Sequence, residues 1–211
     1  MGKIFKDYGL AIGVAIGLAV LIRFFLIEAY RIPSTPSTTP YTMAPTLQPG
    51  DTIFVSKFEY GLRFPWSQQP FYFRRRPTYG EVVVFSPPGD LEIDYIKRVV
   101  ALPGDRIELK NGSLVLNGVP LTLTSPPHSS CGLEKLPGIT IQVCREPPLL
   151  VDFGPITIPE ASVFVLGDTR TQSPDIRKQK GWGIIPISSI KARAKWIWLS
   201  FDYKRMFSRI L

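Results

Sequence analysis

The chain has 211 residues, of which 45% are hydrophobic and 20% charged, so it can bury the core of one or two domains and is not of disordered composition. Its 21 prolines and 17 glycines favour short strands joined by turns over long helices. The net charge of +8 suits an anionic partner, but no run of lysine and arginine with interleaved aromatic residues forms a stripe for binding nucleic acid. We therefore expect membrane lipids, not nucleic acid, as that partner.

An apolar run at residues 8–27 is the first element of the chain. Its length is close to the ~20 residues that cross a bilayer, and Lys3 and Lys6 before it place the N-terminus in the cytoplasm. A cleaved signal peptide is the alternative, but the run is longer than a usual signal core and is not followed by a small-x-small cleavage site. We expect residues 1–28 to be a cytoplasmic N-terminus and an uncleaved single-pass anchor in the cell membrane, with the remaining chain on the extracytoplasmic side.

From Asp51 onward the pattern changes to short β-branched runs that end in Gly, Pro, Asn or Asp. The predicted strands are residues 52–58, 81–87, 95–102, 106–110, 114–118, 156–159 and 162–168. Asn111-Gly112 and Asn117-Gly118 are strong hairpin signals. Residues 187–201 are expected to begin with a short turn and end in a strand. The predicted fold is mainly β, an antiparallel β fold behind one N-terminal transmembrane helix.

The middle of the chain is expected to be a separate lobe. Residues 106–155 are predicted to be an insertion between two parts of a β core, residues 29–105 and 156–211. Residues 120–155 are the least regular part and hold both cysteines, Cys131 and Cys144. These are either free thiols or one disulfide, and we favour the disulfide if the domain lies outside the cytosol. Two cysteines and one histidine are too few for a usual structural zinc site, so no metal is expected.

The candidate chemistry is a hydroxyl paired with a lysine. The only histidine, His128, lies in a loop by composition, which disfavours a Ser-His-Asp arrangement. The remaining hydrolytic options are a hydroxyl with a lysine or a pair of carboxylates. Thr42 lies in a proline-framed, hydroxyl-rich loop at residues 41–51. A lysine base must be neutral, and burial lowers its pKa from ~10.4. Lys97 stands on one strand face between an aromatic and a β-branched neighbour, although most strand lysines point at water.

Four stretches, in order, resemble type I signal peptidases, the membrane-bound serine proteases that remove signal peptides from exported preproteins. They are residues 32–34 with 42–47, residues 50–61, residues 94–105 and residues 167–177, and Gly181-Trp182-Gly183 adds to the likeness. The resemblance implies a signal-peptidase-like fold and endopeptidase activity, without cofactor or metal. It also implies substrates that are secretory preproteins with small side chains one and three residues before the cut.

The resemblance assigns the site residues. Thr42 matches the nucleophile and Lys97 the general base. Supporting roles in base orientation, oxyanion binding or bracing are implied for Ser34, Met43, Asp168, Arg170, Ser173, Asp175 and Arg177, of which Ser173 matches the hydroxyl that orients the lysine.

The candidate nucleophile loop departs from the family pattern. Thr42 stands where the family has serine, and its extra methyl restricts χ1 and crowds an incoming carbonyl. Pro40 replaces a serine that helps to bind the oxyanion, which leaves Ser34, Ser37, Thr38 or Thr39 as substitutes. Two alternatives to a general signal peptidase follow. One is a catalytically weakened relative that binds preproteins or partners, and the other is a specialised peptidase for pilin or conjugation proteins.

Overall fold

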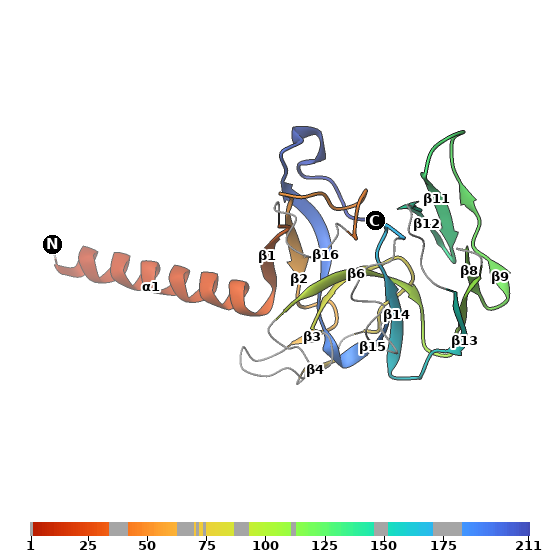
Figure 1. The fold of residues 1–211 in the computed structure, drawn as a ribbon. Helices are drawn as coiled ribbons and strands as arrows, with labels where there is room; N and C mark the ends of the chain where they lie inside the picture. The colour runs from red at the N-terminus through yellow and green to blue at the C-terminus, as the bar shows by residue number, and fades with distance from the viewer. Residues whose placement is uncertain are drawn as a thin grey trace.

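The computed structural model describes residues 2–33, 42–62, 70, 72–73, 75–86, 93–110, 113–145, 152–170 and 183–211. Helix α1 (Gly2–Phe25) extends away from the β domain (Figure 1). Among the residues described, no helix is long and apolar enough to span a membrane, so the anchor predicted at residues 1–28 is not confirmed.

A seven-stranded antiparallel sheet forms the centre of the β domain, in the order β1-β2-β16-β5-β6-β14-β15. Its strands are β1 (Ile27–Arg31), β2 (Thr52–Ser56), β5 (Val82–Phe85), β6 (Tyr95–Ala101), β14 (Ser162–Leu166), β15 (Ile184–Pro186) and β16 (Ile190–Leu199). Side chains alternate between the faces of a strand, and each face of this sheet is covered by an apolar cluster. Val82 and Val84 of β5 belong to one cluster, and Val83 and Phe85 to the other. Burial on both faces explains why β5 contains only apolar residues.

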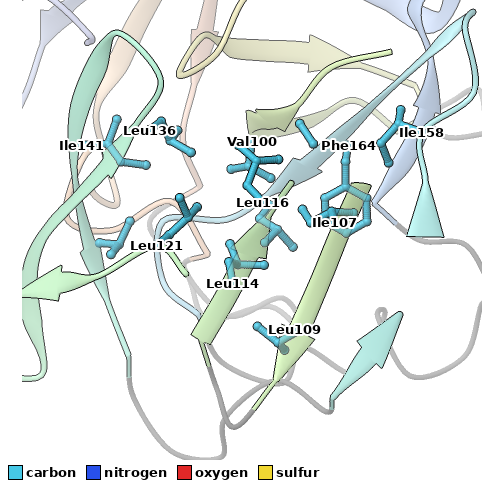
Figure 2. Close-up of a cluster of buried hydrophobic side chains, with 13 residues drawn as sticks. Val100, Ile107, Leu109, Leu114, Leu116, Leu121, Leu136, Ile141, Ile158 and Phe164 are labelled. Carbon is cyan, nitrogen blue, oxygen red and sulfur yellow. The ribbon is translucent and has the colours of Figure 1, made fainter. Parts of the chain in front are cut away.

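Three smaller sheets complete the domain. The four-stranded sheet runs β13-β7-β8-β9, the three-stranded sheet β10-β11-β12, and β3 pairs with β4. Their strands are β3 (Gly61–Leu62), β4 (Tyr72–Phe73), β7 (Arg106–Lys110), β8 (Ser113–Leu116), β9 (Val119–Pro120), β10 (Leu123–Thr124), β11 (Cys131–Leu136), β12 (Ile139–Cys144) and β13 (Phe153–Thr157). In Figure 2, Val100 and Phe164 of the central sheet meet Ile107 of β7 and Ile141 of β12 in one buried cluster. The four- and three-stranded sheets thus share this core with the central sheet. The division of the chain at residues 106 and 155 stays a prediction.

Two local predictions are confirmed. Asn117 and Gly118 have φ values of 52° and 81° in the tight turn between β8 and β9, the left-handed conformation that an Asn-Gly hairpin turn requires. Residues 187–201 begin with the short helix η1 (Ile187–Ser189) and continue as β16. The Asn111-Gly112 signal lies outside the described residues, although β7 and β8 on either side of it pair antiparallel.

The expectation that residues 120–155 are irregular is wrong for their central part. β11 and β12 form a regular hairpin in which Cys131 is the cross-strand partner of Cys144. A disulfide joins the two, as favoured above. The alternation in β11 was hidden because one of its inward positions holds Glu134, whose side chain is fully buried. A charged residue at a core position makes a strand look like a polar loop.

Candidate active site

The structure brings the predicted nucleophile and base together. Lys97 lies in β6, opposite Val83 of β5, and only 9% of it is exposed. Its Nζ donates a hydrogen bond of 2.5 Å to Oγ1 of Thr42, which begins a turn at residues 42–46. A hydroxyl within hydrogen-bond reach of an amine is the arrangement required for proton transfer between the two groups.

The turn that carries Thr42 is fixed from within by its own core contacts. The amide of Leu47 donates to the carbonyl of Met43 at 2.8 Å. Met43 and Leu47 are 6% and 2% exposed and belong to the apolar cluster that also contains Ile53 and Val55 of β2. Met43 thus has a packing role beside Thr42.

Residues 167–169 hold the same turn from the side. The amide of Thr169 donates to the carbonyl of Thr42 at 3.0 Å, and its Oγ1 donates to the carbonyl of Ala44 at 2.8 Å. Gly167 lies so close that a Cβ atom there would be 2.2 Å from the Thr42 carbonyl oxygen. Only glycine therefore permits this approach of the two backbones.

A buried ion pair lies behind the turn. Arg98 and Asp168 have side-chain exposures of 1% and 0%, and the guanidinium binds both carboxylate oxygens, Nε to Oδ1 and Nη2 to Oδ2, each at 2.7 Å. The hydroxyl of Thr46 donates to Asp168 at 2.5 Å and accepts from Arg98 at 3.0 Å. Nη1 of Arg98 also donates to the carbonyl oxygens of Gly80, at 2.6 Å, and Leu211. The Asp168 carboxylate binds only a guanidinium and a hydroxyl among these groups, and through Thr46 it braces the turn.

The β11–β12 hairpin supports this bracing. Cys144 pairs with Thr169 in a parallel bridge, with hydrogen bonds of 2.8 Å from Cys144 N–H to the Asp168 carbonyl and 2.7 Å from Arg170 N–H to the Cys144 carbonyl. The Arg170 side chain forms an ion pair of 2.7 Å with buried Glu134. The residues beside Thr42 thus pair alongside the end of β12, which carries the disulfide.

Asp94 fixes the start of β6 ahead of Lys97. Its carboxylate accepts hydrogen bonds from Lys191 at 2.7 Å and from Ser86 and Tyr30 at 2.9 Å. Burial alone would raise the pKa of Asp94, but these donors, with Lys191 first, outweigh it and hold the pKa below its usual value. Asp94 therefore ties β1 and β16 to the strand that carries the candidate base.

Comparison with known proteins identifies the family. The sequence profile of the family described as "Signal peptidase, peptidase S26" matches residues 5–199. The chain belongs to this family. Signal peptidase I of Pseudomonas aeruginosa is 32% identical over 227 residues, covering 97% of this chain and 78% of that protein. Signal peptidase I of Bacillus licheniformis is 32% identical over 193 residues, covering 91% of this chain and 87% of that protein.

A crystal structure of a signal peptidase I from Enterococcus faecalis V583 is 21% identical in sequence, with 56% of this chain and 97% of that chain covered and a TM-score of 0.34. The four sequence stretches resemble the signal peptidase family, and the profile match and the two relatives confirm this resemblance.

Not all of the site residues predicted from the signal peptidase resemblance can be placed. Thr42, Met43, Lys97 and Asp168 meet around the turn at residues 42–46, and Arg170 lies beyond Asp168, paired with Glu134. The remaining four, Ser34, Ser173, Asp175 and Arg177, lie outside the described residues, and their roles stay predictions.

Sequence reasoning missed several residues of this signal peptidase site. They are Thr46, Arg98, Glu134 and Thr169, none of which was assigned a role. Arg98 had a usable signal, because an arginine in a largely apolar strand must either face water or find a buried partner. Thr169 had none, because it bonds through its backbone and hydroxyl to residues far away in the sequence.

Proposed function

We propose that this member of the signal peptidase family removes signal peptides from exported preproteins with a catalytic dyad of Thr42 and Lys97. The removal of signal peptides follows from membership of the family. The dyad is supported by one observation, the 2.5 Å contact between Lys97 Nζ and Thr42 Oγ1 in a half-buried turn. A hydroxyl is a weak nucleophile until an adjacent base removes its proton.

The reaction begins with neutral Lys97, which reverses the direction of the hydrogen bond and accepts the proton of Thr42 Oγ1. The oxygen attacks the scissile carbonyl carbon, and the collapse of the tetrahedral intermediate breaks the C–N bond. The leaving amine receives the proton from Lys97, and the acyl group stays on Thr42. Lys97 then takes a proton from water, whose oxygen attacks the ester carbonyl carbon. The ester C–O bond breaks, and Lys97 returns the proton to Thr42 Oγ1. The backbone N–H of Thr42 contributes to the oxyanion hole.

The substrates are extended segments with small side chains one and three residues before the cut. They dock by adding a strand to an exposed sheet edge, since main-chain hydrogen bonds then supply affinity and small pockets supply specificity. Asp168 and Arg170 brace the site and do no chemistry, because each is held in a buried ion pair, Asp168 with Arg98 and Arg170 with Glu134. Asp175 and Arg177 brace it further. Ser173 orients Lys97, and Ser34 is a candidate for the oxyanion donor that Pro40 lacks.

Cleavage of a preprotein by the detergent-solubilised chain tests the dyad. The parent is expected to cleave, and Thr42→Ala and Lys97→Ala are expected to lower the rate by roughly 10³-fold or more, as removal of a nucleophile or base does in other dyads and triads. Thr42→Ser keeps the hydroxyl and removes the crowding methyl, so it should cleave at least as fast as the parent. Full activity of Lys97→Ala would overturn the dyad.

A binding protein without peptidase activity is the second candidate. It is favoured by the threonine at position 42 and the proline at position 40, which stand where the resemblance expects serines. In that case the parent binds a preprotein without cutting it, and Thr42→Ser restores cleavage. A peptidase specialised for pilin or conjugation proteins would instead cut only those substrates.

We also propose that α1 attaches the protein to the cell membrane, with the N-terminus in the cytoplasm and the β domain on the extracytoplasmic side. The support is the exposed apolar surface of α1. Because the helix extends away from the β domain (Figure 1), its apolar side chains are uncovered, and Leu10 and Val14 are 71% and 63% exposed. The full chain should float with phosphatidylglycerol vesicles, and a chain without residues 1–26 should not. Equal flotation of both would contradict the attachment through α1.

A further inference from the structure

We propose that Arg205 is a positioning residue for Thr42. We call residues 42–51 the nucleophile loop. Arg205 lies at the other end of the chain, in the short helix η2 (Tyr203–Arg205), outside the stretches that carry the family resemblance. The inference rests on the proposed role of Thr42 and adds a second set of contacts with its loop, separate from those made by Thr169.

Arg205 makes three contacts with the nucleophile loop. Nη2 donates to the carbonyl of Thr46 at 2.8 Å, and Nη1 donates to the carbonyl of Pro45 at 3.3 Å. Nη2 also forms an ion pair of 2.7 Å with Asp51, whose side chain is 1% exposed while that of Arg205 is 19% exposed. A guanidinium presents its donors in a fixed planar fork, so these contacts set the loop in one orientation.

Asp51 connects the guanidinium to the base of the loop. The Oδ2 atom that pairs with Arg205 also accepts the amide of Gln48 at 2.8 Å, and the amide of Asp51 donates to the carbonyl of Gln48 at 3.1 Å. The Asp51 carbonyl accepts from Ile32 at 2.8 Å, and Gly50 N–H donates to the Ile32 carbonyl at 3.0 Å. The end of the loop is thereby tied to the chain leaving β1. Arg205 joins this fixed turn to Pro45 and Thr46.

The contacts of Arg205 act on Thr42 through the few residues of the turn between them. Pro45 and Thr46 lie inside the turn that the Leu47 N–H bond to the Met43 carbonyl closes, and Met43 follows Thr42 directly. A shift of the Pro45 and Thr46 carbonyls therefore moves the Thr42 hydroxyl relative to Lys97 Nζ. Proton transfer and attack depend steeply on geometry, and a misplacement of ~1 Å can cost about 10²-fold in rate.

The segment that carries Arg205 is itself anchored. Residues 207–210 turn back along β16, with hydrogen bonds of 2.7 Å from Phe207 N–H to the Ile197 carbonyl and 2.9 Å from Ile210 N–H to the Lys195 carbonyl. Asp202 caps η2 by accepting the amide of Lys204 at 3.0 Å. Because β16 is a central strand beside β2 and β5, Arg205 approaches the loop from a rigid base.

The test uses the full chain in detergent with Arg205→Ala, Arg205→Lys and the matched control Arg209→Ala. Arg209 is exposed, belongs to the same segment, and stacks on Trp196 at 4.8 Å. Arg205→Ala is expected to lower kcat about 10- to 100-fold with KM changed less than about two-fold, since the lost contact positions the reacting atom. Arg205→Lys should recover part of kcat, because one ammonium can pair with Asp51 but cannot span both carbonyls. Arg209→Ala should match the parent. An unchanged kcat in Arg205→Ala, or an equal loss in Arg209→Ala, would overturn the proposal.

Amide hydrogen exchange provides a readout that does not need activity. Arg205→Ala should accelerate exchange in a peptide covering residues 42–51, where the amides of Leu47 and Gln48 are hydrogen bonded. Peptides from the β11–β12 hairpin should exchange as in the parent. Equal acceleration everywhere would mean a general stability role and would overturn the positioning role. If the parent cleaves nothing, the proposed function fails, while the exchange pattern still decides the role of Arg205 in the loop.

Discussion

Two groups of paired charges in this protein use similar side chains in different surroundings. Beside the nucleophile loop, Arg98 and Asp168 are 1% and 0% exposed and bind each other through two hydrogen bonds. Around Glu59 the partners are more numerous and more exposed. Arg75 and Lys195 pair with its carboxylate at 2.6 Å and 2.5 Å, with side-chain exposures of 30% and 33%.

The difference lies in how much each group depends on a single partner. Away from water, a bidentate pair fixes one geometry, and the loss of either partner leaves an uncompensated buried charge. Around Glu59, a lost partner is replaced by a neighbour or by water, and salt screens the attraction. The first group can therefore specify the position of Thr46 and the nucleophile loop, whereas the second only braces the sheet.

Asp168→Asn tests the buried group and should have the largest effect. The amide keeps the shape of the carboxylate but leaves the charge of Arg98 buried without a counter-charge, at a cost of about 3–5 kcal/mol in the free energy of unfolding. Cleavage should fall as well, because an amide nitrogen cannot accept, so Arg98 and Thr46 are left with one acceptor oxygen where the carboxylate offered two. Denaturant unfolding in detergent and preprotein cleavage are the measurements. Glu59→Gln is the control from the half-buried group, and a similar loss in both variants would contradict the distinction between the two groups.

Thr169→Val tests whether the side-chain hydroxyl of Thr169 helps to hold the main chain of the nucleophile loop. The variant removes the hydroxyl that donates to the Ala44 carbonyl at 2.8 Å, and we expect a loss of about 1 kcal/mol with a lower kcat. Thr169→Ser keeps the donor and should behave as the parent in both measurements. If valine and serine have equal effects, the hydroxyl does not hold the loop.

The pH dependence of stability tests the half-buried group around Glu59 and should have the smallest effect. Burial alone would raise the pKa of Glu59, but hydrogen bonds from Lys195 and Arg75 lower it from 4.5 to about 2. A depressed folded-state pKa adds stability above the unfolded value of 4.5, and this is lost as the pH falls towards about 2. The loss should stay below about 1 kcal/mol, as for other partly exposed pairs. Thermal unfolding between these pH values should show a smaller decline for Glu59→Gln than for the parent, and an identical decline would refute the assignment.

The sequence by itself determined many of the strands, β16 and most of its neighbours in the central sheet among them, and the dyad candidates. β-branched runs bounded by turn residues predicted β2, β5, β6 and β14, because β-branched side chains fit the pleated, buried surface of a sheet and turn residues end it. Family motifs predicted Thr42 and Lys97, which the structure places in contact. The hairpin of β11 and β12 escaped prediction because Glu134 breaks the apolar alternation and is stabilised by Arg170, 36 positions away in the sequence.

Only the tertiary structure decided how the nucleophile loop is held. Thr46 meets Asp168 across 122 positions of sequence, and Arg205 meets Thr46 across 159. Such contacts leave no periodic pattern, since they depend on how the sheet and the chain's end pack and not on local spacing. A polar group can be read as surface until its buried partner is known, which is why the supports of Thr42 came from the fold and Thr42 itself from the sequence.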